Sequence, residues 1–201
     1  MEQEVEIPQS PQQPVTQDQV LQAALQLFAQ KGYFNTSLID IKDAAGLTST
    51  AQLHQFFKTK QAIAQALHDH IFDSFSISID DIRRRNRKVS EQLREIVDLL
   101  FKLAEDAPEI VQFLLFVKAE DFLPEVKPQQ EMPAFVKIRR IVQNGIREGE
   151  IRSIDPVLAY SYFFGIVIHS LALAMNQTLP KTAESYLSQV WMTAWGCIAK
   201  K

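Results

Sequence analysis

Residues 48–58 form a run of mainly small and polar side chains that follows Gly46. Gln can form two hydrogen bonds with adenine, hydroxyl groups and an Ala methyl can contact other base edges, and Lys can bind phosphate. Two short helices joined by a tight glycine turn present such side chains to the DNA major groove, and Gly46 can adopt the positive φ that the turn needs. The expected DNA-binding residues are Thr36, Ser37, Thr48, Ser49, Thr50, Ala51, Gln52, His54, Gln55, Lys58 and Lys60.

Motifs for catalysis or metal binding are absent from the sequence. It has no P-loop, no glycine-rich dinucleotide fingerprint, no His-Glu-x-x-His and no Gly-x-Ser-x-Gly. His68 and His70 are two residues apart on a predicted helix and therefore point to different faces, which disfavours a shared metal. The single cysteine, Cys197, cannot form an internal disulfide and fits a reducing cytosol. We therefore expect no catalytic residues, no metal and no cofactor.

Polar caps predict where the helices that carry the DNA-binding residues begin. Gly32 and Gly46 are typical of the position just after a helix end. Thr59 can cap a long helix that runs from Lys60 to about Asp80 or beyond. The other three helix starts are the capping boxes Thr16-x-x-Gln19, Ser37-x-x-Asp40 and Ser49-x-x-Gln52.

The rest of the chain predicts further helices and no strands. Sustained period-2 alternation and hairpin turns are missing, so the expected fold class is all-α. We predict an N-terminal three-helix helix-turn-helix headpiece and a C-terminal helical bundle body, with about nine helices in total. The expected body helices run from Ser90 to Leu103, from Pro108 to Phe122, from Pro133 to Gly149, from Pro156 after the cap Asp155, and from Pro180 to the C-terminus.

Composition sets the limits of this organisation. The chain has 201 residues and is 46% hydrophobic, which is enough for one large or two small cores. Residues 1–15 are rich in Pro, Gln and Glu, and we expect a disordered tail. The longest apolar segment, residues 160–175, is expected to be a buried core helix because it contains Ser161, His169 and Ser170. The N-terminus has no secretory or transit signal, so we expect a cytoplasmic protein that contacts no membrane.

Two stretches of the chain resemble the DNA-binding headpiece of the TetR family of transcriptional regulators. The resemblance implies a helix-turn-helix domain at residues 16–62 and a ligand-sensing and dimerisation domain at residues 63–201. It also implies a homodimer that binds a palindromic double-stranded DNA operator and is released from it by a small-molecule effector. The matching residues are Leu25-x-Leu27-Phe28-x-x-Lys31-Gly32-Tyr33-x-x-Thr36-Ser37-x-x-x-Ile41-x-x-Ala44-Ala45-Gly46-Leu47-Thr48 and Leu53-His54-x-x-Phe57-Lys58-Thr59-Lys60.

The charge of the expected headpiece is balanced. The net charge of the chain is −3, and residues 16–70 contain four Lys and four Asp. Few counterions would then be released from DNA, which predicts weak nonspecific affinity and a shallow salt dependence. One alternative is therefore a helical interaction module that keeps the TetR-like scaffold and has lost specific DNA binding. A second alternative is an all-α enzyme or lipid carrier that uses a cavity in the body.

Residues 83–88, with the sequence Arg-Arg-Arg-Asn-Arg-Lys, are the most basic segment of the chain. Phosphate binding is one interpretation. The resemblance puts this segment at the end of the long connecting helix that lies farthest from DNA. Cations near a helix C-terminus are also favoured by the helix dipole, so we expect a solvated helix end.

Aromatic and apolar side chains of the body supply candidates for two further surfaces. Aromatic residues at helical spacing are typical of a core, but as a set they predict that any effector cavity is apolar. Surplus apolar surface on the last two helices favours a partner over a wholly intramolecular core. The expected effector pocket consists of Phe72, Phe75, Phe101, Phe113, Phe116, Phe135, Tyr162 and His169. The expected dimer interface consists of Phe163, Phe164, Val167, Leu171, Leu187, Trp191 and Trp195.

Overall fold

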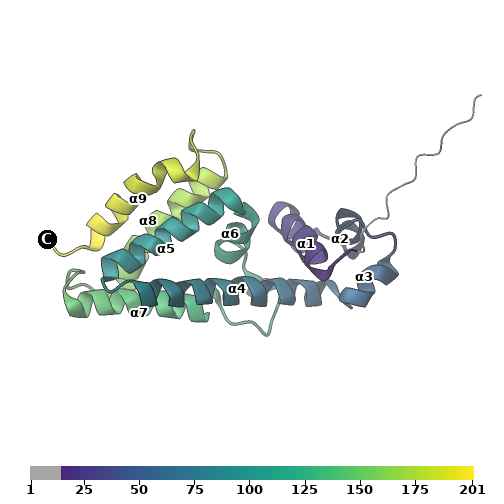
Figure 1. Ribbon diagram of the computed structural model, residues 1–201, viewed down its shortest axis with the longest axis horizontal. Coiled ribbons are helices and arrows are strands. Elements are labelled where there is room, and N and C mark those ends of the chain that lie inside the picture. Colours follow the sequence, from purple (N-terminus) through teal and green to yellow (C-terminus); the bar gives the residue numbers. More distant parts are fainter. Residues whose placement is uncertain (1–14) are drawn as a thin grey trace, which may run out of the picture.

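The computed structural model describes residues 15–201, and within them the all-α prediction is confirmed (Figure 1). Apart from Val15, the predicted tail lies outside the described residues. An isolated bridge joins Ile151 to Ala199. The described α-helices are α1 (Gln17–Lys31), α2 (Leu38–Ala44), α3 (Thr50–Phe56), α4 (Lys60–Arg85), α5 (Val89–Asp106), α6 (Pro108–Leu115), α7 (Pro133–Glu148), α8 (Pro156–Met175) and α9 (Ala183–Ile198), with 3-10 helices η1 (Ala119–Asp121) and η2 (Gln129–Glu131).

The helix α4 connects two parts of the molecule (Figure 1). Helices α1, α2 and α3 lie together around its N-terminal end, and its C-terminal end lies at the opposite end of the molecule. In the body, α8 packs against α9 and α7, α5 packs against α9, α6 and α7, and α4 packs against α7. Helix α1 also contacts α6, so the headpiece touches the body at a second place besides α4.

The predicted capping boxes form at the starts of α1 and α2. The box predicted at α3 forms only in part, because Ser49 accepts from the Gln52 backbone N–H but the Gln52 side chain bonds to Thr48. The Thr16 hydroxyl accepts a hydrogen bond from the Gln19 backbone N–H, and the Ser37 hydroxyl accepts one from the Asp40 backbone N–H. In both cases the third helical residue bonds back to the cap, which satisfies two otherwise free donors. Gly46 has a φ of +71°, the conformation that the turn between α2 and α3 was expected to need.

The helix predicted from Pro108 to Phe122 is shorter in the structure, where α6 ends at Leu115. The Gln129 side-chain amide donates to the Leu114 carbonyl across 2.5 Å, so a residue distant in sequence satisfies an acceptor that a longer helix would have used. The chain then turns and forms η1, which ends beside Phe122. The predicted end of this helix was therefore wrong, and the contact between Gln129 and Leu114 joins residues 15 positions apart that a local sequence pattern does not relate.

The segment predicted to be a buried core helix, residues 160–175, belongs to α8 and is only partly buried. Its inward face includes Phe163, Val167 and Leu171, which pack into the core. By length and composition alone, α8 could cross a membrane, and only 28% of its apolar window is buried. The rest of its apolar surface faces outward, which bears on the interfaces described below.

Candidate DNA-binding surface and effector cavity

Helix α3 is held by its apolar side and presents its polar side to solvent. Leu47, Leu53 and Phe57 are buried as part of the main apolar core, and α3 packs against α2. They fix α3 from the turn before it to the residue after it, so its outer side is free for a partner. The predicted DNA-binding residues that are exposed on this part of the headpiece are Thr48, Ser49, Thr50, Ala51, Gln52, Gln55 and Lys58.

Two of the predicted contacts on α3 are partly engaged within the protein. The Gln52 side-chain oxygen accepts hydrogen bonds from the backbone N–H and the hydroxyl of Thr48, at 3.0 and 2.9 Å. Its amide nitrogen remains as a donor. His54 is half-buried, and its Nδ1 lies 3.3 Å from the Phe57 carbonyl oxygen. Gln55 and Lys58 form no side-chain hydrogen bond or ion pair within residues 15–201, so they are the least constrained groups of this surface.

The two predicted residues at the start of α2 lie in different environments. Thr36 is 1% exposed, and its hydroxyl donates to the Gly32 carbonyl at 2.9 Å. Its burial therefore excludes the DNA contact expected for its side chain. Ser37 is exposed and caps α2 through its hydrogen bonds with Asp40.

Lys60 differs most from its expected role as a phosphate contact. Its ammonium donates to the carbonyl oxygens of Tyr33 and Thr36, at 2.9 and 2.7 Å, and lies 4.2 Å from the centre of the Tyr33 ring. Burial lowers the pKa of Lys60 from its ordinary value. This first residue of α4 thus binds the loop between α1 and α2, and we call these three contacts the Lys60 clamp.

An aromatic contact that the sequence did not predict joins the headpiece to the body. The Tyr33 ring stacks on Phe122 with centroids 4.1 Å apart and planes 11° from parallel. Phe28 and Phe34 pack against the other sides of Tyr33. Phe122 follows η1 and so belongs to the segment that α6 leads into. The two rings are separated by 89 positions, and no periodicity in the sequence relates them.

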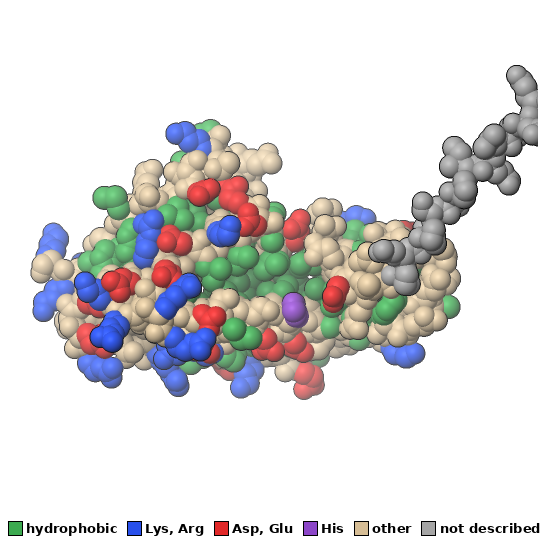
Figure 2. All heavy atoms as spheres, viewed as in Figure 1, with side chains coloured by type: hydrophobic (Ala, Val, Ile, Leu, Met, Phe, Trp, Pro, Cys, Tyr) green, Lys and Arg blue, Asp and Glu red, His purple; other side chains and the backbone are tan. Residues whose placement is uncertain are grey.

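A cavity of about 180 Å³ lies between α4, α5 and α6, and we call it the α4–α6 cavity. Figure 2 shows hydrophobic side chains gathered at this place. Exposed His70 and Ser74 stand at its rim, so it is open to solvent. It is lined by His70, Ile71, Ser74, Phe75, Ser78, Leu99, Leu103, Ile110 and Leu114.

A wider and more open cleft of about 520 Å³ lies between the headpiece and the body. Ala29 and Gln30 of α1 form one wall, and residues of α6 and α8 form the others. Phe116, a predicted pocket residue, lines this cleft.

Of the eight residues predicted to form the effector pocket, only two line a cavity or cleft in the structure. Phe75 lines the α4–α6 cavity and Phe116 the wider cleft. Tyr162 is 44% exposed and His169 is also exposed, because α8 turns both to the outer surface of the body. The remaining four, which are buried core residues that line neither space, are Phe72, Phe101, Phe113 and Phe135.

The predicted dimer residues divide between the two faces of α8 and α9. Four of them are turned into the protomer and are not available to a second copy, namely Phe163, Phe164, Val167 and Leu171. Leu187, Trp191 and Trp195 are half-buried, and the two Trp rings stack 5.6 Å apart. The outward apolar residues that sequence reasoning missed are Val157, Leu158, Tyr162 of the pocket prediction, and Met192.

Comparison with known proteins identifies this architecture. Residues 20–67 match the family model described as "Bacterial regulatory proteins, tetR family". The chain is 35% identical over 168 residues to the HTH-type transcriptional repressor KstR2 of Mycolicibacterium smegmatis, and the match covers 77% of this chain and 78% of that protein. The chain belongs to the TetR family. As a TetR-family member it is a DNA-binding transcriptional regulator and not an enzyme.

Two further proteins are similar to this chain, one in sequence and one in fold. The probable HTH-type transcriptional regulator YttP of Bacillus subtilis is 24% identical over 87% of this chain and 81% of its own length. The fold is also that of FadR from Bacillus subtilis, solved in complex with stearoyl-CoA, which superposes with a TM-score of 0.71 at 19% identity over 89% of this chain and 97% of that chain.

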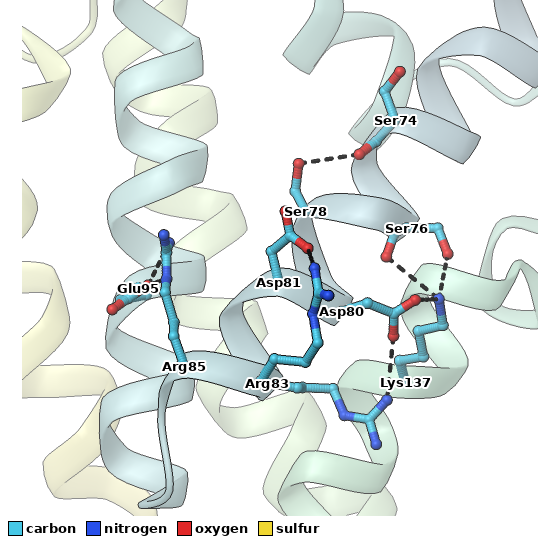
Figure 3. Close-up of polar contacts among 10 residues, drawn as sticks. Ser74, Ser76, Ser78, Asp80, Asp81, Arg83, Arg85, Glu95 and Lys137 are labelled. Atoms are coloured by element: carbon cyan, nitrogen blue, oxygen red, sulfur yellow. Dashed lines mark hydrogen bonds and ion pairs between the residues drawn. The ribbon is translucent and has the colours of Figure 1, made fainter.

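The far end of α4 in this TetR-family body is fixed by ion pairs (Figure 3). The Lys137 ammonium on α7 donates to the Ser76 hydroxyl at 2.7 Å and to the Asp80 carboxylate at 2.5 Å, both on α4. The hydrogen bond from Lys137 is the largest cause that holds the pKa of Asp80 below its ordinary value. Arg85 pairs with Glu95 of α5 at 2.6 Å. Part of the basic segment 83–88 is thus neutralised by carboxylates at the end of the molecule opposite α3.

Proposed function

We propose that the protein is a cytoplasmic homodimeric repressor that binds a palindromic operator and is released by a small, largely apolar effector. The headpiece, residues 16–62, would bind DNA, and residues 63–201 would sense the effector and dimerise. The observation that carries this proposal is the exposed polar side of α3, which three buried apolar residues hold in position. Each copy of the headpiece would fill one half-site, so the symmetry of the dimer would be repeated in the operator.

Within α3 the side chains divide by their chemistry. Gln55 is exposed and free, so it is the best candidate for a two-bond contact with adenine. Thr50 and Ala51, at the N-terminal end of the helix, would contact base edges through a hydroxyl and a methyl group. Lys58, just beyond the C-terminal end of α3, would bind phosphate and set the orientation.

The homodimer would form through the outward faces of α8 and α9. Leu158, Tyr162 and His169 follow one another at helical spacing along α8, and all three are exposed. Met192 on α9 is 72% exposed. Exposed apolar residues that gather on neighbouring helices are typical of a protein–protein interface. In a four-helix arrangement with a second copy, these residues would be buried.

Release would depend on a path from the α4–α6 cavity to the headpiece. Ile110 and Leu114 line the cavity and belong to α6. The chain after α6 leads to Phe122, which stacks on Tyr33. An effector that binds better when α6 is displaced would weaken that stack and shift α4, and so favour dimers whose headpieces no longer match the operator.

Selection of bound duplexes from a random pool tests this proposal. The purified protein is expected to enrich an inverted repeat, and a variant with Gln55→Ala and Lys58→Ala, both exposed, is the matched control that should enrich no motif. Failure of the wild-type protein to enrich any motif, while it remains folded, would contradict the proposal and favour the helical interaction module.

A further inference from the structure

The size of the α4–α6 cavity restricts what it can bind. Its volume is about 180 Å³. A pocket for a drug-sized ligand has roughly 300–1,000 Å³, whereas an engineered protein cavity of about 150 Å³ lined by Leu, Ile and Phe binds benzene. The apolar lining is of the same kind here, with Ile71, Phe75 and Leu114 buried and three more aliphatic residues half-buried around them. The space therefore fits one ring and not a long chain.

The charge of the lining restricts the ligand further. No Lys, Arg, Asp or Glu is among the residues that line the cavity, and His70 is its only ionisable group. A carboxylate or a phosphate buried against this lining would lose part of its hydration and find no Lys or Arg side chain there to replace it. Such a ligand would bind poorly, so an uncharged molecule is favoured.

One wall of the cavity supplies polar groups. His70, Ser74 and Ser78 are spaced four residues apart along α4 and form a polar row beside the apolar floor. The Ser78 hydroxyl donates to the Ser74 carbonyl at 3.0 Å, which uses its proton. The Ser74 hydroxyl and the His70 ring form no hydrogen bond within residues 15–201, so they remain free for a ligand.

We propose that the ligand of the α4–α6 cavity is an uncharged single-ring molecule with one hydroxyl or carbonyl oxygen. Its ring lies on Ile71, Phe75 and Leu114, and its oxygen bonds to Ser74. This inference rests on the proposed function, because it names the chemical class of the effector. It also separates this protein from the B. subtilis FadR solved with stearoyl-CoA, a ligand with a long chain and several phosphates.

Calorimetric titration of the full chain tests the inference with phenol, cyclohexanol, benzene, benzoate and stearoyl-CoA. Phenol and cyclohexanol are expected to bind, benzene about tenfold more weakly because it lacks the oxygen, and benzoate and stearoyl-CoA not measurably. Binding of stearoyl-CoA without binding of phenol or cyclohexanol would overturn the inference. So would equal affinity for benzoate and phenol.

Two variants test whether phenol binds in the α4–α6 cavity. Leu103→Phe fills the space and is expected to abolish phenol binding, and Ser74→Ala is expected to reduce it about tenfold while benzene binding stays the same. Ser153→Ala, an exposed serine outside the cavity, is the control. Should Leu103→Phe fail to fold, Ser74→Ala alone decides the assignment. Phenol affinity that neither folded variant changes would contradict it.

These titrations contain no DNA, so their outcome does not depend on whether the protein selects an operator. If phenol binds as described and the protein selects no operator, the proposed function fails and the ligand assignment stands. If an operator is found and phenol does not bind, the ligand assignment fails and the proposed function stands.

Discussion

Cations form contacts at both ends of α4, but their binding partners differ. At the N-terminal end, the Lys60 ammonium binds two backbone carbonyls and an aromatic ring of the headpiece. At the C-terminal end, Arg85 and Lys137 connect α4 to α5 and α7 through carboxylates. The polar contacts at the far end are thus several partly exposed ion pairs, whereas those at the DNA-proximal end come from one half-buried cation beside an aromatic stack.

This difference indicates which end can move. Partly exposed ion pairs contribute little individually, but those at the far end span three helices and act together with the apolar contacts of the body. The Lys60 clamp and the Tyr33–Phe122 stack consist of a small number of contacts, and both depend on the single loop between α1 and α2. A change at Phe122 can therefore reach the headpiece without disturbing the body.

The largest effect is expected from Lys60→Met, which keeps the apolar stem and removes the clamp. Two carbonyl oxygens lose a charged donor, one of them on the buried Thr36, so the free energy of unfolding should fall by about 3 kcal/mol. Denaturant unfolding measures the loss, and hydrogen exchange should be faster at residues 33–37. Lys58→Met, at an exposed position, is the control and should change stability by less than about 0.5 kcal/mol. Equal effects of the two variants would contradict the clamp.

The substitution Phe122→Ala should cause the next largest loss of stability. It removes one ring of the stack and part of the apolar contact, which costs about 2 kcal/mol for a half-buried Phe. Because Phe122 belongs to the body, faster exchange at Tyr33 in this variant would demonstrate coupling across the two parts. Ile39→Ala, an exposed apolar residue of the headpiece outside the stack, is the comparison and should leave that exchange rate unchanged.

Lys137→Met breaks the far end and should have a smaller effect. Asp80 is 44% exposed in its side chain, so we expect a loss of about 1 kcal/mol and an unchanged operator affinity. The pKa of Asp80 is lowered, chiefly by the Lys137 hydrogen bond, so the stabilisation is complete above the ordinary aspartate value of about 3.9 and disappears as the pH falls through the lower folded value. Acid unfolding curves should therefore be less steep in Lys137→Met, and identical curves would contradict this assignment.

The smallest effect on DNA binding is expected from the basic segment. Replacement of Arg83, Arg84, Arg85, Arg87 and Lys88 by Gln should change operator affinity by less than about twofold, because the segment lies at the end opposite α3. Gel-shift titration at fixed salt measures this. A tenfold loss would mean that the segment binds phosphate.

Local signals in the sequence were sufficient to predict most of the helices. The boxes at Thr16 and Ser37 and the positive φ at Gly46 depend on residues within four positions of one another, and all three were predicted correctly. The outer side of α3 followed from the same local pattern. The resemblance to TetR-family headpieces rested on these residues too, and the family assignment was confirmed.

The features that the sequence did not predict depend on contacts between residues that are distant in the chain. Helix α8 is apolar nearly all round, so its periodicity could not tell that Phe163 faces inward and Tyr162 outward. Lys60 looked like a surface cation because nothing nearby in sequence reveals its contact with Tyr33, 27 positions away. The stack on Phe122 and the early end of α6 are tertiary effects of the same kind.

The account depends most on α3 contacting DNA with its exposed side, and paired titrations of a selected operator and a random duplex test this directly. Gln55→Ala should weaken binding to the operator by roughly 5- to 150-fold and leave the random duplex unaffected, since it removes a base contact of about 1–3 kcal/mol. Lys58→Ala should weaken both duplexes equally and reduce the salt slope by about one. If both variants bind both duplexes as the wild-type protein does, α3 does not contact DNA and the proposed function is wrong.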